Sequence, residues 1–274
     1  MTINCKGNLV DLTTPKVMGI LNITPDSFFA ESRNTPDNHF LTKAERMLNE
    51  GATFIDLGGY STRPGANDIT ISEELERVIP AVELLHKNFP EAHISVDTFR
   101  SRVAEESILA GAAMINDIAA GNLDENMMKV VAKYQVLYIM MHMRGTPQTM
   151  SGLNDYENMM QEVMFYFSEK IKAARSLGIN DLILDPGFGF SKNIVQNFEL
   201  LSQLEFFKEF GLPVLAGLSR KSTIYKTLGC SPEEALNGTT VLNTVALTKG
   251  ASILRVHDVK EAMEAVKLTA ALKN

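Results

Sequence analysis

Short apolar stretches recur along this chain, separated by longer segments whose apolar residues follow helical spacing. Eight of these stretches are five or six residues long, which is typical of strands buried in a parallel sheet. The expected strands are VMGIL (17–21), TFIDLG (53–58), HISVD (93–97), AMINDI (113–118), VLYIMM (136–141), DLILD (181–185), PVLAGL (213–218) and ASILRV (251–256).

The segments between these strands predict helices. The segment 72–88 carries apolar residues along one helix face, and 156–177 is the longest helix candidate. The motif SPEE (231–234) has capping-box spacing with proline at the first helical position, which predicts a helix start there. Asp258 is expected to open the last helix in a similar way.

Strands that alternate with helices predict an α/β protein. Eight such strands predict a single (β/α)8 barrel, the TIM barrel, as one domain over residues 1–274. An open doubly wound sheet is the alternative, because periodicity does not itself show closure. The turn Lys6-Gly7-Asn8 lies between two β-prone stretches and predicts a short N-terminal β-hairpin.

Composition is that of a soluble globular protein, with 45% hydrophobic and 22% charged residues. The formal net charge of −7 disfavours a nucleic-acid or anionic-membrane partner, because both require a basic face. The N-terminal stretch lacks the apolar core of a signal peptide, and no stretch approaches a membrane span. Cys5 and Cys230 are isolated, as free thiols in a reducing compartment are, so we expect a cytoplasmic protein.

Polar side chains follow all eight expected strands. After a single strand, a helix N-cap or a turn would explain such a residue equally well. Their presence after every strand favours a functional site, because the carboxyl ends of barrel strands meet at one mouth. The strand-end residues are Asn22, Asp56, Asp97, Asn116 with Asp117, His142, Asp185, Ser219–Ser222, and Arg255 with His257.

These residues fall into two chemical groups. Carboxylates and amides follow the middle strands and suit a flat heterocycle with several N–H donors and carbonyl acceptors. Cations follow the last two strands, beside Asn22 of the first strand, at the usual phosphate corner of this barrel. A divalent metal held by the carboxylates is the alternative, although the residue pattern of a metal cage is not seen. The first group is Asp56, Asp97, Asn116 and Asp185, and the second is Lys221, Arg255 and His257.

Two glycine-rich loops accompany these residues. GGYSTRPGA (58–66) is expected to form a mobile polar lid, and DPGFGF (185–190) to bring an aromatic ring to the mouth, although both are also compatible with simple turns. The sequence has no GxSxG motif and no cysteine near a His/Asp pair, so no covalent nucleophile is expected.

In these loops and strand ends the chain resembles the dihydropteroate synthase family. GILNITPDSF (19–28) and GATFIDLGGYSTRPGA (51–66) are similar to that family's two pterin-binding signatures. The resemblance covers residues 17–272. Six further motifs match: ISVDT (94–98), INDI (115–118), MHMRGTPQTM (141–150), LDPGFGF (184–190), GLSRKS (217–222) and RVHDVKE (255–261).

The resemblance implies a transferase of folate biosynthesis and a sulfonamide target. The family joins 6-hydroxymethyl-7,8-dihydropterin diphosphate to p-aminobenzoate, giving 7,8-dihydropteroate and pyrophosphate. Its displacement is dissociative: pyrophosphate leaves, a resonance-stabilised pterin methylene cation forms, and the aniline nitrogen attacks. Such a reaction needs orientation and charge placement rather than a nucleophile. The resemblance also implies Mg²⁺ as a cofactor and a homodimer formed through the outer helices of the last repeats.

Residue roles are likewise implied by matching positions. The expected catalytic residues, which contact the pterin ring, are Asp97, Asn116, Asp185 and Lys221. The pocket is expected to be lined by Met141 and Gly217 and supported by Asp56. Pyrophosphate is expected to contact Asn22, Arg255 and His257, with Mg²⁺ bound at Asn22. The residues expected around p-aminobenzoate are Thr62, Arg63, Pro64, Phe190 and Ser222.

The chain departs from the family pattern in its first loop. The aspartate common after DSFS is Ala30 here, with Glu31 one place later, so either Glu31 substitutes or the loop is built differently. Tyr60 replaces the glutamate often found before STRPG. A non-catalytic paralogue, favoured only by the first loop, is one alternative. A corrinoid-linked pterin methyltransferase is another, and the pyrophosphate motifs SRKS and RVHDV disfavour it.

Overall fold

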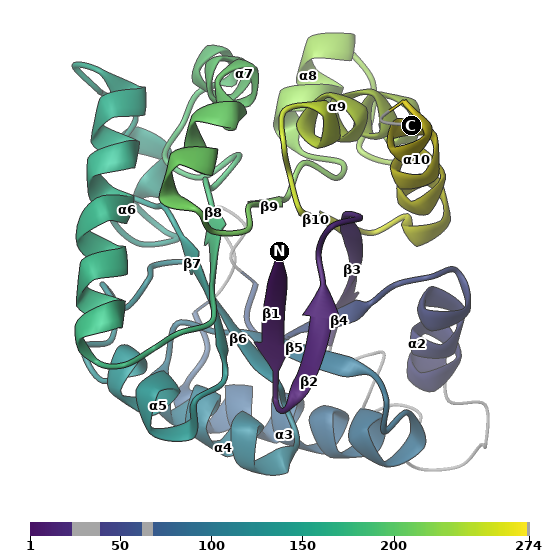
Figure 1. The fold of residues 1–274 in the computed structure, drawn as a ribbon, viewed down its shortest axis with the longest axis vertical. Coiled ribbons are helices and arrows are strands. Elements are labelled where there is room, and N and C mark those ends of the chain that lie inside the picture. Colours follow the sequence, from purple (N-terminus) through teal and green to yellow (C-terminus); the bar gives the residue numbers. More distant parts are fainter. Residues whose placement is uncertain (24–38, 62–67, 273–274) are drawn as a thin grey trace.

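A ring of parallel strands enclosed by helices forms the centre of the molecule (Figure 1). The computed structural model describes residues 1–23, 39–61 and 68–272. Its eight-stranded parallel sheet has the order β8-β7-β6-β5-β4-β3-β10-β9, and a parallel bridge from Leu184 to Val214 links the two edges. The sheet therefore closes, which confirms the barrel against the open sheet. The strands are β3 Lys16–Asn22, β4 Phe54–Gly58, β5 His93–Asp97, β6 Met114–Asp117, β7 Leu137–Met141, β8 Leu182–Asp185, β9 Leu215–Ala216 and β10 Ile253–Val256.

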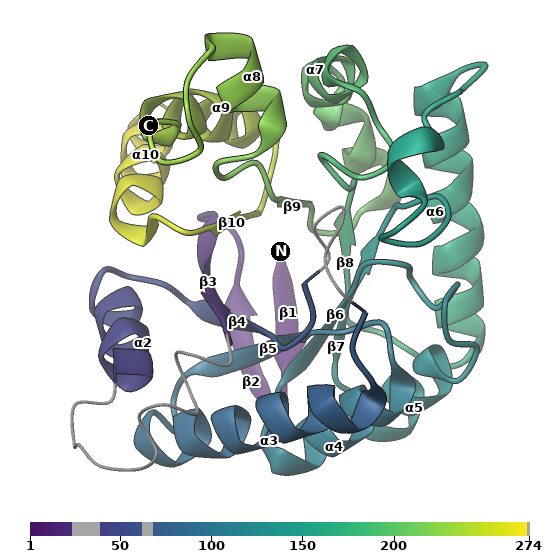
Figure 2. The same ribbon diagram turned by 180° about the vertical axis from the view of Figure 1, so that it is seen from behind.

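Each barrel strand leads into at least one helix, and the helices encircle the sheet in both views (Figure 2). The expected helices over 72–88 and 156–177 are confirmed. The helices are α2 His39–Asn49, α3 Ile71–Asn88, α4 Ser101–Ala110, α5 Met127–Tyr134, α6 Met159–Ser176, α7 Ile194–Ser202, α8 Ser222–Leu228, α9 Leu236–Thr248 and α10 Val259–Ala271, with 3₁₀ turns η1 Met150–Gly152 and η2 Leu204–Phe210.

All eight expected strands are present, and they differ from the prediction mainly in length. HISVD matches β5 at both ends. PVLAGL contributes only two residues to β9. Pro213 has no N–H to donate to a ladder, and the chain leaves the sheet at Gly217.

The N-terminal hairpin is confirmed and closes one end of the barrel, which we call the base. β1 Thr2–Cys5 pairs antiparallel with β2 Asn8–Asp11. The turn residues Lys6 and Gly7 have φ values of 52° and 90°, the left-handed conformation that a two-residue hairpin turn needs. The hairpin lies over the barrel end that faces the viewer in Figure 1 and packs on apolar side chains inside the strands.

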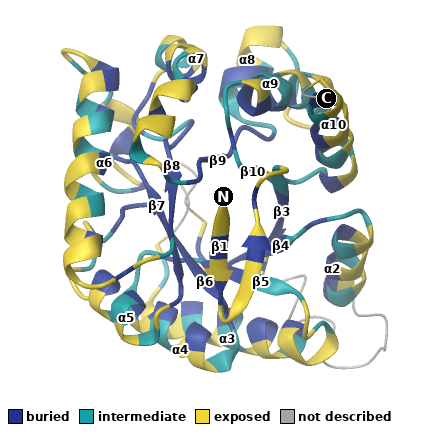
Figure 3. Cartoon of the chain, in the orientation of Figure 1, coloured by how far each residue is buried: buried dark blue, intermediate teal, exposed yellow. Residues whose placement is uncertain are grey.

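Two apolar cores flank the strands. The larger core lies between the strands and the helices, and the smaller core fills the base beneath the hairpin. Figure 3 shows the barrel strands as mostly buried and the outer faces of the helices as exposed, as expected for helices that bury one face. Among the described helices, none is both long and apolar enough to cross a membrane.

Two predicted helix starts differ from the structure. At one the helix begins later in the chain, and at the other the expected capping side chain binds a different group. Ser231 and Glu234 form the two capping-box bonds, at 2.9 and 3.4 Å, but the residues after Ser231 form a turn and α9 begins at Leu236. The helix start predicted at 231 is therefore wrong. Asp258 does precede α10, yet its carboxylate caps no N–H because it binds the guanidinium of Arg220.

Candidate active site

Four alternate strands carry the same three-residue pattern of apolar, apolar and polar side chains. The first residue of each triplet lies in the core of the base, and the second lies in the core beneath the helices. Because side chains alternate along a strand, the third residue faces the barrel interior above the first. A polar layer at the mouth is the result. The triplets are Phe54-Ile55-Asp56 in β4, Met114-Ile115-Asn116 in β6, Ile183-Leu184-Asp185 in β8 and Ile253-Leu254-Arg255 in β10.

Arg255 joins three strands within this polar layer. Its Nε donates to Oδ2 of Asp56 at 2.6 Å, and its Nη2 donates to Oδ2 of Asp97 at 2.8 Å. Asn116 donates to the same Asp56 oxygen at 3.1 Å. Burial lowers the pKa of Arg255, but the charges of Asp56 and Asp97 together raise it by more than burial lowers it. The net pKa is therefore above its ordinary value. Arg255 is therefore a permanent cation that holds the carboxylates in place.

One oxygen of this layer lacks a donor. Oδ1 of Asp56 is fully buried and has no hydrogen-bond partner among the described residues. Buried acceptors are nearly always paired with a donor from protein, water or ligand. The mouth of the barrel therefore offers a buried acceptor to a bound N–H or water.

The carboxyl groups of Asp97 and Asp185 are both perturbed by burial. Burial raises the pKa of Asp97 to about 7, and the charge of Arg255 opposes this shift. Burial also raises the pKa of Asp185, which the charge of Lys221 opposes. Oδ1 of Asp185 in addition accepts the N–H of Gly187 at 2.8 Å. Both carboxyl groups therefore take up a proton at a higher pH than a surface carboxylate does.

Lys221 enters the site from the loop between β9 and α8. Its Nζ donates to the carbonyl oxygen of Phe188 and lies 4.9 Å from the ring centre of Phe190. Burial lowers the pKa of Lys221 to about 8, and the negative charge of Asp185 opposes this shift. A Cβ on Gly217 would lie 3.8 Å from Nζ, so this glycine borders the ammonium group directly.

A second group of polar residues stands at the ends of β3 and β10. Nδ1 of His257 lies 3.0 Å from Oγ of Ser219, and the same hydroxyl accepts the backbone N–H of His257 at 3.2 Å. Asn22 ends β3 with its side chain exposed, opposite Gly58 in the register of β4. An imidazole and an amide are thereby presented beside the Arg255 end of the polar layer.

Apolar side chains border the other side of the mouth. Met141, at the end of β7, packs in a small cluster with Ile118 and Met143, and Phe190 lies against that cluster. The two predicted pocket residues Met141 and Phe190 thus lie together. Ser222 follows Lys221 directly and begins α8.

The predicted site is therefore largely assembled, with some exceptions. Asp117 turns away from the site, because its carboxylate accepts from the hydroxyl of Tyr138 at 2.6 Å and from two backbone N–H groups. His142 faces a buried lysine instead of the polar layer. The residues brought together at the mouth are Asp56, Asp97, Asn116, Asp185, Lys221 and Arg255. The predicted residues outside the described ranges are Ala30, Glu31, Thr62, Arg63 and Pro64.

A metal site built from side-chain carboxylates is not supported. Among residues 1–23, 39–61 and 68–272, no group of three or more His, Cys, Asp or Glu side chains could hold a metal ion. The carboxylates of Asp56 and Asp97 already have Arg255 as their counter-charge.

Two buried polar groups next to the site were missed by sequence reasoning. Lys192 contacts His142 behind the DPGFGF loop. Glu74 is fully buried, accepts from the hydroxyl of Thr98 at 2.7 Å and binds Arg100 at 2.8 Å. Charged residues of these types are mostly exposed, so the sequence gives no signal that they are buried here.

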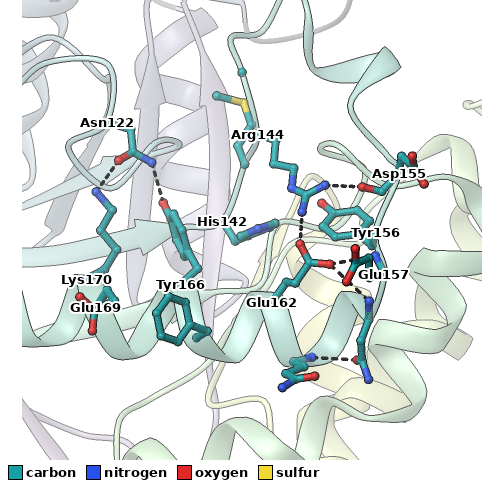
Figure 4. Close-up of a pocket in the computed structure, with 15 residues that line it drawn as sticks. Asn122, His142, Arg144, Asp155, Tyr156, Glu157, Glu162, Tyr166, Glu169 and Lys170 are labelled. Carbon is teal, nitrogen blue, oxygen red and sulfur yellow. Dashed lines mark hydrogen bonds and ion pairs between the residues drawn. The ribbon is translucent and has the colours of Figure 1, made fainter.

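A groove of about 1110 Å³ lies outside the mouth, between α6 and the loops that follow β6 and β7 (Figure 4). Both of its cationic side chains have partners: Arg144 binds Glu162, and Lys170 donates to Asn122. Of the predicted strand-end residues, His142 lines this groove, whereas the polar-layer residues Asp56, Asp97, Asn116, Asp185, Lys221 and Arg255 do not. It is separate from the polar layer.

Fold and site together define an enzyme of the (β/α)8 class whose mouth binds a small polar ligand. The pterin binding enzyme family matches residues 18–257. Dihydropteroate synthase of Escherichia coli K12 is 43% identical over 273 residues, which cover 99% of this chain and 96% of that protein. The chain therefore belongs to the dihydropteroate synthases of the pterin-binding enzyme family.

Solved structures agree with this assignment. Dihydropteroate synthase of Yersinia pestis in a sulfonamide complex is 41% identical, with a TM-score of 0.91 and coverage of 100% of this chain and 99% of that one. The enzyme of Xanthomonas albilineans with 4-aminobenzoic acid is 38% identical, with a TM-score of 0.90 and coverage of 99% and 98%. The predictions of a pterin-binding barrel enzyme and of dihydropteroate synthase function are confirmed.

Proposed function

We propose that this chain condenses 6-hydroxymethyl-7,8-dihydropterin diphosphate with p-aminobenzoate, as a transferase of folate synthesis, with residue roles that follow the geometry of the mouth. The observation that carries the proposal is the polar layer, in which buried acceptors and two cations meet above an apolar base. Family membership supplies the reaction, and the layer supplies groups that suit both of its substrates.

The pterin ring is assigned to the acceptors of the layer. A pterin presents N–H donors and ring acceptors along one edge, which matches the carboxylates of Asp97 and Asp185 and the amide of Asn116. The buried Oδ1 of Asp56 supports this assignment, because it needs a donor. Lys221 supplies a donor to the acceptors of the ring, and Met141 provides apolar contact.

The catalytic contribution is electrostatic. When the C–O bond to pyrophosphate breaks, positive charge develops on the pterin methylene and negative charge on the leaving group. Asp97 and Asp185 stabilise the cation, while Arg255 and His257 stabilise the departing pyrophosphate. Arg255 uses two of its N–H donors on Asp56 and Asp97, and a guanidinium has five, so donors remain for phosphate oxygens.

The attacking p-aminobenzoate is assigned to the side of the mouth that holds Phe190 and Ser222. The aniline nitrogen attacks the methylene carbon, and the proton it loses passes to solvent or to the pyrophosphate. The 4-aminobenzoic acid complex of the Xanthomonas albilineans enzyme supports binding of this substrate. Thr62, Arg63 and Pro64 are proposed to complete this pocket.

Mg²⁺ is proposed as the cofactor at Asn22. Magnesium commonly takes few protein ligands and completes its shell with water and substrate phosphates, so an exposed amide oxygen at the phosphate corner fits this ion. When bound, the ion supplies positive charge that stabilises the leaving pyrophosphate.

We also propose a cytoplasmic homodimer. Exposed apolar side chains on the outer helices of the last repeats support the dimer: Leu228 on α8 is 60% exposed, Val241 on α9 53%, and Leu268 on α10 72%. Analytical ultracentrifugation is expected to give a particle mass of twice the chain mass. A monomer mass at micromolar concentration contradicts the dimer.

The test of the proposed function is pyrophosphate release with Mg²⁺, measured with and without p-aminobenzoate. Release that depends on p-aminobenzoate and gives dihydropteroate is the expected result. Lys221→Ala is expected to abolish turnover while the barrel stays folded, because the side chain serves the mouth rather than the base. Tight pterin binding without turnover in the natural protein would instead indicate a non-catalytic paralogue.

A further inference from the structure

A buried lysine, Lys192, lies behind the DPGFGF loop and has no role in the reaction outlined above. Only 8% of its surface is exposed. Its Nζ lies 3.1 Å from the carbonyl oxygens of both Gly187 and Phe190, and 3.0 Å from Nδ1 of His142. An ammonium group has three N–H donors, so each donor has one acceptor here.

Burial acts on the protonation of both His142 and Lys192. Burial, and next the charge of Lys192, lowers the pKa of His142 well below its ordinary value. The ring is therefore neutral, with Nδ1 as acceptor and the proton on Nε2. Burial also lowers the pKa of Lys192 to about 7, and the charge of Asp185 opposes this shift. Burying a cation is costly, so the contacts made by Lys192 must offset that cost.

The loop that Lys192 contacts has a left-handed backbone at three positions and packs closely on the end of β7. Gly187, Gly189 and Ser191 have φ values of 75°, 79° and 50°, in the left-handed region. A Cβ on Gly187 would lie 2.1 Å from the carbonyl oxygen of His142, so the loop sits directly on the end of β7. Lys192 binds the carbonyl oxygens of residues 187 and 190 and so holds the loop at two points, before and after residues 188 and 189.

The same loop carries groups that face the site. The carbonyl of Phe188 accepts from Lys221, and the ring of Phe190 lies 4.9 Å from the Lys221 ammonium. Lys192 acts more directly on Phe190 than on Lys221, because the carbonyl of Phe190 is one of the three acceptors of Lys192. Lys221 has a second electrostatic partner in Asp185.

We propose that Lys192 is a positioning residue for p-aminobenzoate, which holds the ring of Phe190 at the mouth by binding its carbonyl. This inference rests on the proposed function, which places p-aminobenzoate beside Phe190. Removal of the ammonium releases the loop on the side of Phe190, whereas the acceptors Asp97, Asn116 and Asp185 stay on their strands. The KM for p-aminobenzoate then rises, and the KM for the pterin diphosphate does not.

The experiment compares Lys192→Met, which keeps the chain length and removes the donors, with the natural enzyme. We expect the KM for p-aminobenzoate to rise on the order of tenfold, with an unchanged KM for the pterin diphosphate. Lys192→Arg restores donors and is expected to restore much of the affinity. The matched control is Lys170→Met on α6: this lysine donates to Asn122, away from the loop, and its loss should change neither KM.

An unchanged KM for p-aminobenzoate in folded Lys192→Met overturns the proposal. An equal rise in both KM values also overturns it, because that result indicates general loosening of the barrel. If Lys192→Met does not fold, Lys192→Gln, whose side chain is one atom shorter and carries no ammonium, is measured with the same expected split between the substrates. A natural enzyme without pyrophosphate release would refute the proposed function instead, so the two failures are distinguishable.

Discussion

Ile253 and Arg255 lie two residues apart on β10 and both face the interior of the barrel, but they belong to different regions. Ile253 packs in the base among apolar side chains, and Arg255 binds two carboxylates at the mouth. The same step separates Phe54 from Asp56 on β4. One layer of side chains thus holds the barrel together, and the layer above it performs chemistry on the same strands.

The largest expected effect comes from the mouth. Arg255→Met keeps the aliphatic stem and removes the charge that binds Asp56 and Asp97. We expect kcat/KM to fall by about 10²–10³-fold, the usual effect of removing one electrostatic group from an active site. Steady-state pyrophosphate release measures this change. A normal kcat/KM in the Arg255→Met enzyme would contradict the assignment of Arg255 to the active site.

The matching change at the base should affect stability instead. Ile253→Ala leaves a cavity among packed side chains and is expected to lower the free energy of unfolding by about 2–5 kcal/mol. The kcat/KM of the folded enzyme should stay unchanged, because no group at the mouth is removed. Urea unfolding and the same activity assay check both statements. If Ile253→Ala lost activity without losing stability, the separation between the two layers would fail.

The third expected effect is the dependence of kcat/KM for the pterin diphosphate on pH, which the mouth should produce because Lys192 is proposed to affect only p-aminobenzoate. Below pH of about 7 Asp97 gains a proton and loses its charge, and above pH of about 8 Lys221 loses its proton. The profile should therefore be bell-shaped, with kcat/KM falling about tenfold per pH unit on each side. Asp97→Asn should remove the acidic limb from any remaining activity. A profile that is flat from pH 6 to 9 would contradict these assignments.

Sequence patterns predicted the barrel well because every strand is buried on both faces and therefore appears as an apolar run. HISVD coincides with β5, and the polar ends of β4, β6, β8 and β10 do meet. The boundaries failed where local and tertiary signals differ. SPEE forms its capping bonds but begins no helix at 231, and Asp258 binds Arg220 instead of capping α10.

The part of the site that could not be predicted consists of contacts made through the backbone. Nothing in the run DPGFGFSK indicates that Lys192 turns inward to bind two carbonyl oxygens, because lysine is normally exposed and a carbonyl has no sequence identity. Asp117 shows the opposite case. It stands beside Asn116 at a strand end, but the strand alternation turns it outward to Tyr138.

The ion pairs of Arg255 also bear on how the chain is made. Arg255 is 199 residues from Asp56 and 158 from Asp97 along the sequence. On the ribosome, the two acids are therefore synthesised long before their cation. Until β10 emerges, Asp56 and Asp97 lack the guanidinium that pairs with them, and the closing edge between β3 and β9 is open. Completion of the polar site and closure of the barrel thus depend on the same late segment, so a nascent chain has no active intermediate that lacks it.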